Sequence, residues 1–217
     1  MNIDKRITVL LGFCLFFFGT QSIVAQDAQE VISKVQERVN TDQPLRVDFQ
    51  QVFEWKVTGK VERLDGMMVL QGLKKFRIAT PDQTVVSNGE TMWTYSRLEN
   101  QVIIDNVRQD AQTLMPRDIL FTYPEQYDAQ IWKKNLLIDG TSAVVLRLTP
   151  KDQDQFLQDL KVWVNRDSWQ PLQVEFTDLN NNTTSYEITS VQVDSSITEE
   201  TFTFQPDSTT EIIDVRQ

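Results

Sequence analysis

Short segments in which apolar and polar residues alternate fill most of the chain after residue 44. Successive side chains of a strand point to opposite faces, so each segment predicts a strand with one apolar face. Turn-forming residues separate the segments, which predicts antiparallel hairpins. These turns are Thr58-Gly59-Lys60, Asn88-Gly89, Asp139-Gly140, Asn165-Arg166-Asp167 and Asn180-Asn181-Asn182. About eleven strands are expected, and the chain belongs to the mainly β class.

The first segment predicts one long strand from Leu45 to Val57. Its apolar residues occupy odd positions, a pattern that only Gln51 interrupts. They are Leu45, Val47, Phe49, Phe53, Trp55 and Val57. The clearest hairpin spans residues 135–149, where two apolar runs flank Asp139-Gly140. Both segments predict strands with a continuous apolar face.

Three regions depart from this pattern and predict about three helices. Residues 27–40 carry apolar side chains at helical spacing, which predicts an amphipathic helix. Residues 110–124 include LMPRDILFTYP, where Pro116 suits the first turn of a short apolar helix. Ser196 and Glu199 have the spacing of a capping box, which predicts a last helical turn over residues 197–201.

The N-terminal residues resemble a secretory signal peptide. Lys5 and Arg6 precede an apolar run from Ile7 to Phe18, and Ala25 provides a small residue near the expected cleavage point. The run of about a dozen residues is short of the ~20 that span a bilayer, so a retained anchor is the weaker alternative. We therefore predict a signal peptide over residues 1–25 and one exported domain over residues 26–217.

Composition excludes several kinds of chemistry. The chain has no histidine, and its only cysteine, Cys14, lies in the predicted signal peptide. Histidine-based catalytic triads, imidazole or thiolate metal sites and disulfides are therefore not expected in the mature chain. Glycine-rich phosphate loops are also missing, and the net charge of -10 disfavours nucleic acid. We expect a protein that is not an enzyme and needs no metal or cofactor.

Large and adaptable apolar residues gather in the first part of the predicted domain. They are Phe49, Phe53, Trp55, Met67, Met68, Phe76, Met92, Trp93, Tyr95, Met115 and Phe121. Such side chains suit an irregular apolar cavity. They equally suit the core of a plain β-sheet, and composition alone does not decide between the two.

Several short motifs occur in the order found in one protein family. Residues 83–96, QTVVSNGETMWTYS, resemble a hydrophobic strand, turn and WxY strand of the periplasmic outer-membrane lipoprotein carrier family, LolA. Residues 47–51, VDFQQ, resemble the F-x-Q motif of its first strand. The other motifs in family order are Phe76 with Pro81-Asp82, LTPK at 148–151, V-x-V-x-R-D at 162–167, Ser185-Tyr186 and FTFQP at 202–206. Together they cover essentially the whole predicted mature chain.

The resemblance implies an open antiparallel β half-barrel, capped by helices that enclose a hydrophobic cavity for acyl chains. On this basis, and depending on which strand face points inward, one set of residues is expected to form the cavity wall: Val47, Phe49, Phe53, Trp55, Leu70, Phe76, Ile78, Trp93 and Tyr95. A second set is expected to form the lid: Met115, Ile119, Leu120 and Phe121. The family commonly carries Arg-Pro where this chain has Gly72-Leu73, so the family's lid latch does not transfer to it.

The resemblance also implies partners. The expected cargo is the acyl chains of lipoproteins, the expected donor is an inner-membrane lipoprotein-releasing transporter, and the expected recipient is an outer-membrane acceptor. A periplasmic monomer that does not bind nucleic acid is expected. Three alternatives remain: a LolA-like lipid-binding sensor or regulatory module of the cell envelope, a lipid-acting enzyme, and a structural envelope domain.

Overall fold

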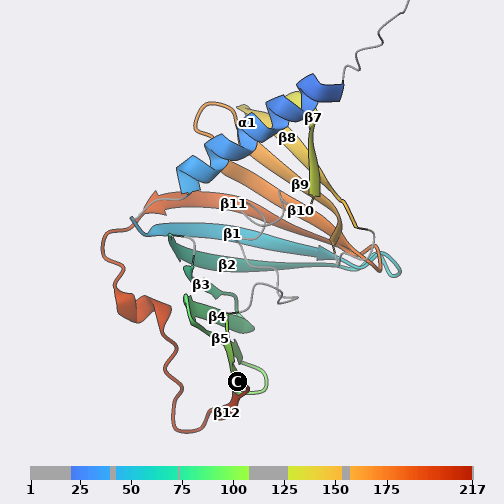
Figure 1. Cartoon of the computed structure of the whole chain (residues 1–217). Helices are drawn as coiled ribbons and strands as arrows, with labels where there is room; N and C mark the ends of the chain where they lie inside the picture. The colour runs from blue at the N-terminus through green and yellow to red at the C-terminus, as the bar shows by residue number, and fades with distance from the viewer. Residues whose placement is uncertain (1–20, 40–42, 73, 108–126, 153–156, 217) are drawn as a thin grey trace, which may run out of the picture.

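The computed structural model describes residues 21–39, 43–72, 74–107, 127–152 and 157–216. Twelve strands form one sheet in the order β12-β6-β5-β4-β3-β2-β1-β11-β10-β9-β8-β7 (Figure 1). The strands are β1 (Leu45–Glu54), β2 (Val61–Gln71), β3 (Lys75–Ala79), β4 (Gln83–Asn88), β5 (Thr91–Ser96), β6 (Gln101–Asn106), β7 (Tyr127–Ile138), β8 (Thr141–Pro150), β9 (Leu157–Asn165), β10 (Pro171–Asp178), β11 (Thr183–Val193) and β12 (Glu211–Asp214). β7 and β12 are its two edges, so the sheet is open.

Two antiparallel meanders build this sheet. β1 to β6 form the first and β7 to β11 form the second, each with sequential neighbours. β11 then pairs antiparallel with β1, which joins the meanders in the middle of the sheet. β12 pairs with β6 and is parallel to it. The predicted antiparallel hairpins are confirmed, and the parallel edge strand is an addition that the sequence pattern did not indicate.

The described residues contain one α-helix, α1 (Gln21–Val39), and one short 3-10 turn, η2 (Glu199–Phe202). The prediction of about three helices is therefore not confirmed. The proposed helix over residues 110–124 lies outside the described residues. The predicted capping box is wrong, because Thr198 is the residue before η2 and makes no side-chain cap, while the Ser196 hydroxyl bonds to Asp194 at 2.6 Å. No helix in the described ranges is long and apolar enough to cross a membrane.

The first strand is shorter than its alternation predicts. β1 ends at Glu54, and the chain then turns, with the Gly59 amide donating to the Trp55 carbonyl at 2.8 Å. Gly59 has a φ of 65°, a conformation that glycine adopts without a steric penalty. Val57 lies in this turn and is 93% exposed, so the prediction of a strand to Val57 is wrong. Turn chemistry outweighs the apolar alternation here.

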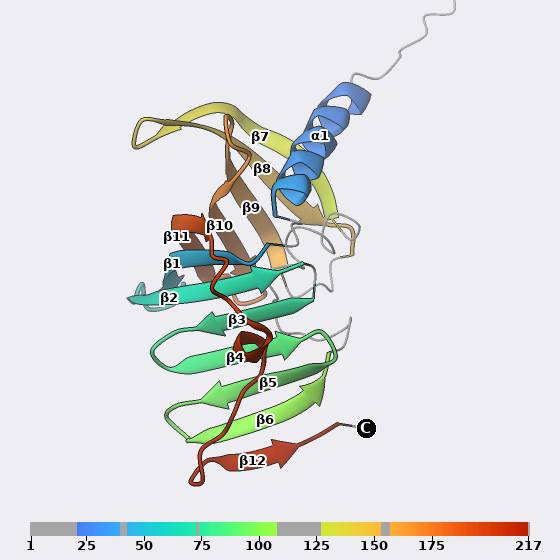
Figure 2. The same ribbon diagram turned by 90° about the vertical axis from the view of Figure 1, so that its left-hand side faces the viewer.

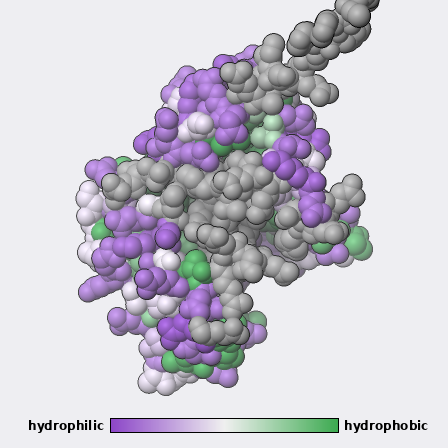
Figure 3. Space-filling model, in the orientation of Figure 1, coloured by the Kyte–Doolittle hydropathy of each residue, from purple (hydrophilic) through white to green (hydrophobic). Residues whose placement is uncertain are grey.

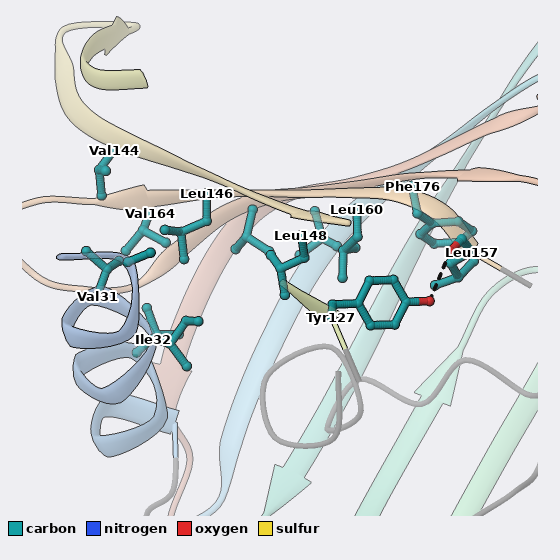
Figure 4. Close-up of a cluster of buried hydrophobic side chains, with 14 residues drawn as sticks. Val31, Ile32, Tyr127, Val144, Leu146, Leu148, Leu157, Leu160, Val164 and Phe176 are labelled. Atoms are coloured by element: carbon teal, nitrogen blue, oxygen red, sulfur yellow. Dashed lines mark hydrogen bonds between the residues drawn. The ribbon is translucent and has the colours of Figure 1, made fainter. Parts of the chain in front are cut away.

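α1 packs its apolar stripe on one face of the second meander, and we call this side of the sheet the helix face (Figures 1 and 4). The stripe consists of Ala28, Val31, Ile32 and Val35, each at most 7% exposed. Its partners on the strands include Tyr127, Val144, Leu146, Leu148, Leu157, Leu160, Val162, Val164, Val174 and Phe176. Helical spacing on α1 and strand alternation on β8 to β10 therefore converge on one core.

Tyr127 is the polar member of this core. Its hydroxyl donates to the Leu157 carbonyl at 3.0 Å (Figure 4), and its side chain is 2% exposed. Burial disfavours the phenolate and raises the pKa of Tyr127 to about 12. The folded protein therefore keeps this hydroxyl protonated at pH values where an exposed tyrosine ionises.

This shift predicts a loss of stability in alkaline solution. The Tyr127 contribution should be fully present below pH 10.0, the ordinary pKa, and should be lost as the pH rises through about 12. Denaturant unfolding across this range should show a shallower decline for Tyr127→Phe than for the wild type. At neutral pH the same variant should be less stable by about 1 kcal/mol, because it lacks the hydrogen bond to Leu157. If the stability of both proteins fell equally with pH, the raised pKa of Tyr127 would not be the cause of the alkaline loss of stability.

The C-terminal residues 194–210, which we call the strap, cross the opposite side of the sheet, which we call the strap face (Figure 2). η2 lies within the strap and contacts β3 and β4. The Arg77 guanidinium donates to the Thr201 carbonyl at 3.4 Å, and the Lys75 amino group lies 2.6 Å from the Glu199 carboxylate. Phe202 is fully buried. The strap thus gives the first meander an apolar core on the side away from α1.

Candidate functional site

Strand register determines which residues share the helix face. Residues directly opposite each other in an antiparallel pair point to the same side of the sheet. Val174 and Phe176 belong to the helix-face core and pair with Tyr186 and Thr184 of β11. Tyr186 pairs in turn with Gln51 of β1. The helix face therefore continues from the second meander into the first.

Six of the nine predicted wall residues lie on this face. They are Val47, Phe49 and Phe53 of β1, Leu70 of β2, and Phe76 and Ile78 of β3. Val47, Phe49 and Phe76 are at most 5% exposed. Phe53, Leu70 and Ile78 are partly exposed. The structure thus brings these six residues onto one continuous apolar surface.

The same register adds residues that sequence reasoning did not place in the wall. Leu64 pairs with Gln51, and Met68 pairs with both Val47 and Ile78. On β4 and β5, Val85 lies opposite Ile78 and Met92 lies opposite Ser87. Phe76 and Met92 form a cluster against which Leu70, Ile78, Val85 and Val107 pack. Counting outward from the Asn88-Gly89 turn is the sequence feature that could have identified Val85 and Met92.

Trp93 and Tyr95 lie on the other side of the sheet. They pair with Val86 and Thr84, which face away from the helix. Tyr95 stacks on Phe204 of the strap at a centroid distance of 5.0 Å and donates to Asn100 at 3.0 Å. These two rings belong to the core under the strap, and the structure does not bring them together with the other predicted wall residues.

Trp55 lies beyond the end of β1, in the turn before β2. Its ring meets the edge of Phe53 at a centroid distance of 4.3 Å, and the Lys60 amino group lies 4.9 Å from the Trp55 ring. Trp55 therefore sits at the rim of the helix face. The predicted lid residues Met115, Ile119, Leu120 and Phe121 lie outside the described residues.

The position of the family's latch motif has a distinct backbone here. Gly72 follows the end of β2 and has a φ of 58°, and the space around its missing side chain is open. An arginine at this position would have to adopt a left-handed conformation that L-residues with a side chain rarely take. The local backbone is therefore adapted to glycine, whereas Leu73 lies outside the described residues.

A separate cavity of about 350 Å³ opens between α1 and the second meander. It is lined by Asp27, Glu30, Val31, Lys34, Ile131, Lys134, Val144, Arg166 and Trp169. Its charges largely satisfy one another: Lys134 lies 3.0 Å from Asp27, and Lys34 lies 2.6 Å from Glu30. Such a lining is unsuited to an acyl chain. The apolar helix face is therefore the better candidate for a ligand site.

Two further features of the described residues concern metal ligands and exposed apolar surface. They contain no group of three or more His, Cys, Asp or Glu side chains that could hold a metal ion. In the orientation of Figure 1, apolar surface is visible at the lower end of the molecule, around β5 and β12 (Figure 3). Ile103, Ile212 and Ile213 are exposed in that region.

The fold is that of an open β half-barrel with an apolar inner face. Residues 40–205 match the family described as outer membrane lipoprotein carrier protein LolA. Because this match covers most of the chain, the protein belongs to the LolA family. The resemblance seen in the sequence motifs is thereby confirmed.

A solved structure from Thermus thermophilus shares the fold. This uncharacterized conserved protein has a TM-score of 0.61 at 15% identity, over 87% of this chain and 99% of that one. A putative outer membrane lipoprotein-sorting protein domain from Vibrio parahaemolyticus has a TM-score of 0.48 at 12% identity, over 82% and 97%. An uncharacterized protein of Methanocaldococcus jannaschii is 23% identical over 78% of this chain. The chain spans 49% of the length of that curated relative.

Proposed function

We propose that this protein is a periplasmic carrier that binds the acyl chains of lipoproteins released from the inner membrane and delivers them to the outer membrane. The observation that supports this proposal most strongly is the continuous apolar helix face of β1 to β5, where Phe53, Leu70 and Ile78 remain partly exposed. Membership of the LolA family is consistent with it. The protein acts by binding, with no catalytic role.

The energetics of acyl chains explain why such a face is needed. Each exposed CH₂ costs about 0.8 kcal/mol in water, so a dozen methylenes cost roughly 10 kcal/mol. A carrier must shield most of this surface yet still release its cargo. Adaptable side chains such as Met68 and Met92 suit this requirement, because they contact many chain conformations without selecting one. An inner-membrane transporter would load the carrier, and an outer-membrane acceptor of higher affinity would unload it.

The proposal includes export of the domain to the periplasm and predicts that lipid is bound there. Residues 1–25 would act as a signal peptide that exports the domain, which would work as a monomer. Native mass spectrometry of protein purified from the periplasm should detect a bound diacylated lipid or lipoprotein. Binding without transfer to acceptor membranes would instead support a lipid-sensing module.

A charge on the helix face should disrupt binding selectively. Ile78→Glu places a carboxylate among the apolar residues of β2 to β4, so the affinity for a diacylated lipopeptide should fall about tenfold. Because Ile78 is partly exposed, the free energy of unfolding should fall by only ~1–2 kcal/mol. Calorimetric titration and denaturant unfolding on one preparation measure both quantities.

Leu98→Glu is the matched control, because Leu98 lies in the turn between β5 and β6 and is 94% exposed. This variant should bind the lipopeptide like the wild type. Normal binding by a folded Ile78→Glu protein would remove Ile78 from the site. Failure of the wild type to bind any diacylated lipopeptide would contradict the carrier function itself.

A further inference from the structure

Two polar side chains lie directly opposite each other in the middle of the apolar helix face. Gln51 of β1 pairs with Tyr186 of β11. Their neighbours in the same row are apolar, with Leu64 opposite Gln51 on β2 and Val174 opposite Tyr186 on β10. Side chains opposite each other in an antiparallel pair have Cβ atoms about 4.5–5.5 Å apart. An amide and a hydroxyl therefore share one place on an otherwise apolar surface.

Aromatic neighbours hold the Tyr186 ring in position. The Phe49 ring meets it edge to face at a centroid distance of 5.4 Å, and the Phe176 ring lies 6.2 Å away on its other neighbouring strand. Tyr186 also packs against the buried cluster beneath α1. Contacts of this kind fix the plane of an aromatic ring. The hydroxyl of Tyr186 is thus a positioned group.

Gln51 and Tyr186 are partly buried, and their hydrogen bonding differs from that of the buried Tyr127 and Ser87. Tyr127 donates to the Leu157 carbonyl, and the fully buried Ser87 donates to the Lys74 carbonyl at 3.0 Å. Within the described part of the chain, neither the Gln51 amide nor the Tyr186 hydroxyl forms a side-chain hydrogen bond. Both side chains therefore keep donors that an acceptor group of a ligand can use without breaking a hydrogen bond within the protein.

The protonation state of Tyr186 makes it a donor. Burial raises the pKa of Tyr186 above its ordinary value, so the hydroxyl keeps its proton at neutral pH. The Gln51 amide offers two further N–H donors. A saturated hydrocarbon has no group that could accept any of these hydrogen bonds. A carbonyl oxygen can accept two, one on each lone pair.

We propose that Gln51 and Tyr186 form a hydrogen-bonding site for a carbonyl oxygen of the ligand. This carbonyl belongs to the linkage that joins an acyl chain to the rest of the lipid. This inference rests on the proposed function and adds a polar group to the ligand that the site recognises, the carbonyl of an ester or amide linkage. A carbonyl held there places the first methylenes of the chain beside Phe49 and Leu64, the apolar neighbours of Gln51 on β1 and β2. The Gln51–Tyr186 pair would therefore determine the position of the lipid's carbonyl linkage on the apolar helix face.

Matched lipids test the carbonyl directly. Binding is measured for a diacyl lipopeptide with ester linkages and for its dialkyl analogue, which has ether linkages and chains of the same length. The wild type should bind the ester about fivefold to tenfold more tightly, as expected for a hydrogen bond gained. Tyr186→Phe and Gln51→Leu should each reduce this preference, and the double variant should abolish it. The ether should bind all these proteins about equally.

Two substitutions on the opposite face of the sheet are controls. Tyr95→Phe removes a hydroxyl on the strap face, and Gln50→Leu changes a residue that faces away from the helix and bonds to Asp65 at 3.0 Å. Both variants should keep the wild-type preference.

A second pair of ester- and ether-linked glycerophospholipids shows the source of the carbonyl. Preference with both pairs supports recognition of the linkage itself, and preference with the lipopeptide pair alone supports a lipopeptide site.

The outcomes separate this inference from the carrier function. Equal, tight binding of ester and ether by the wild type contradicts the carbonyl site and leaves the carrier function standing. A preference that Tyr186→Phe and Gln51→Leu do not change also contradicts the site. No binding of either lipopeptide contradicts both proposals. Tyr186→Phe removes a single oxygen atom, so thermal unfolding near that of the wild type is expected and confirms that the comparison concerns binding.

Discussion

Replacing Phe202 with alanine is expected to lower the free energy of unfolding by about 3–5 kcal/mol and to loosen β12 from β6. Phe202 is fully buried and is the anchor of η2, which contacts β3 and β4. Removing its ring leaves a cavity on the strap face beside residues that are themselves buried. No other strap residue is buried to this degree within the described residues.

Hydrogen exchange shows whether the strap itself has loosened. β12 is held to β6 by backbone bonds that include Glu211 N–H to Asn100 at 2.9 Å and Val215 N–H to Ile104 at 2.9 Å. Exchange at these amides should accelerate in Phe202→Ala, together with the fall in stability found by denaturant unfolding. Val215→Ala is the control, because Val215 is 43% exposed and its loss should cost under about 1 kcal/mol. Unchanged stability in Phe202→Ala would show that the strap is dispensable for the core.

The strap also explains why Trp93 and Tyr95 lie apart from the other residues expected in the cavity wall. β4, β5 and β6 have apolar residues on both faces, because one face continues the helix face of the sheet while the strap crosses the other. Val86 and Val102 on the strap face are fully buried, as is Phe202 above them. On such a strand, an apolar residue indicates that the position is buried but does not indicate which face of the sheet it occupies. Only the register, counted from a neighbouring turn, separates the two faces.

Local turn chemistry made much of the sheet predictable. The Asn88-Gly89 turn places Gly89 at a φ of 99°, and the Asn88 side chain accepts bonds from the amides of Glu90 and Thr91. Asp139 and Gly140 both adopt positive φ between β7 and β8. These residues favour such conformations intrinsically, so the sequence identifies the hairpins directly. The motif order then identified the family.

Long-range pairings could not be predicted from local patterns. β1 pairs with β11 across most of the chain, and β12 pairs with β6 after the strap has crossed the sheet. Their register depends on the relative placement of whole meanders, which no turn encodes. The Gln51–Tyr186 pair is a direct product of the β1–β11 register, so neither residue could be recognised as half of a site from its own neighbourhood. Its two residues were visible beforehand only as separate family motifs.

Gly66→Ala is expected to destabilise the protein by about 2–3 kcal/mol. Gly66 lies on the helix face of β2, directly opposite Phe49, and a Cβ there would fall 2.4 Å from Cζ of the Phe49 ring. The ring is 4% exposed and contacts Tyr186, so it cannot move without disturbing the surrounding core. The direction of the stability change is informative. Glycine in a strand interior ordinarily costs about 0.5–1 kcal/mol relative to alanine, so without the Phe49 contact Gly66→Ala would be expected to stabilise the protein. Denaturant unfolding measures the difference.

A double-mutant cycle distinguishes this steric cause from a general intolerance of β2 to substitution. Phe49→Leu shortens the side chain that covers Gly66, so Gly66→Ala should cost little or even stabilise in that background, with a coupling energy of about 2 kcal/mol. If Gly66→Ala were as damaging beside Leu at position 49 as beside Phe49, contact with the ring would not be its cause. A coupling energy of the expected size would show that the absence of a side chain at residue 66 allows Phe49 to lie against the sheet. From there Phe49 also holds the Tyr186 ring beside Gln51.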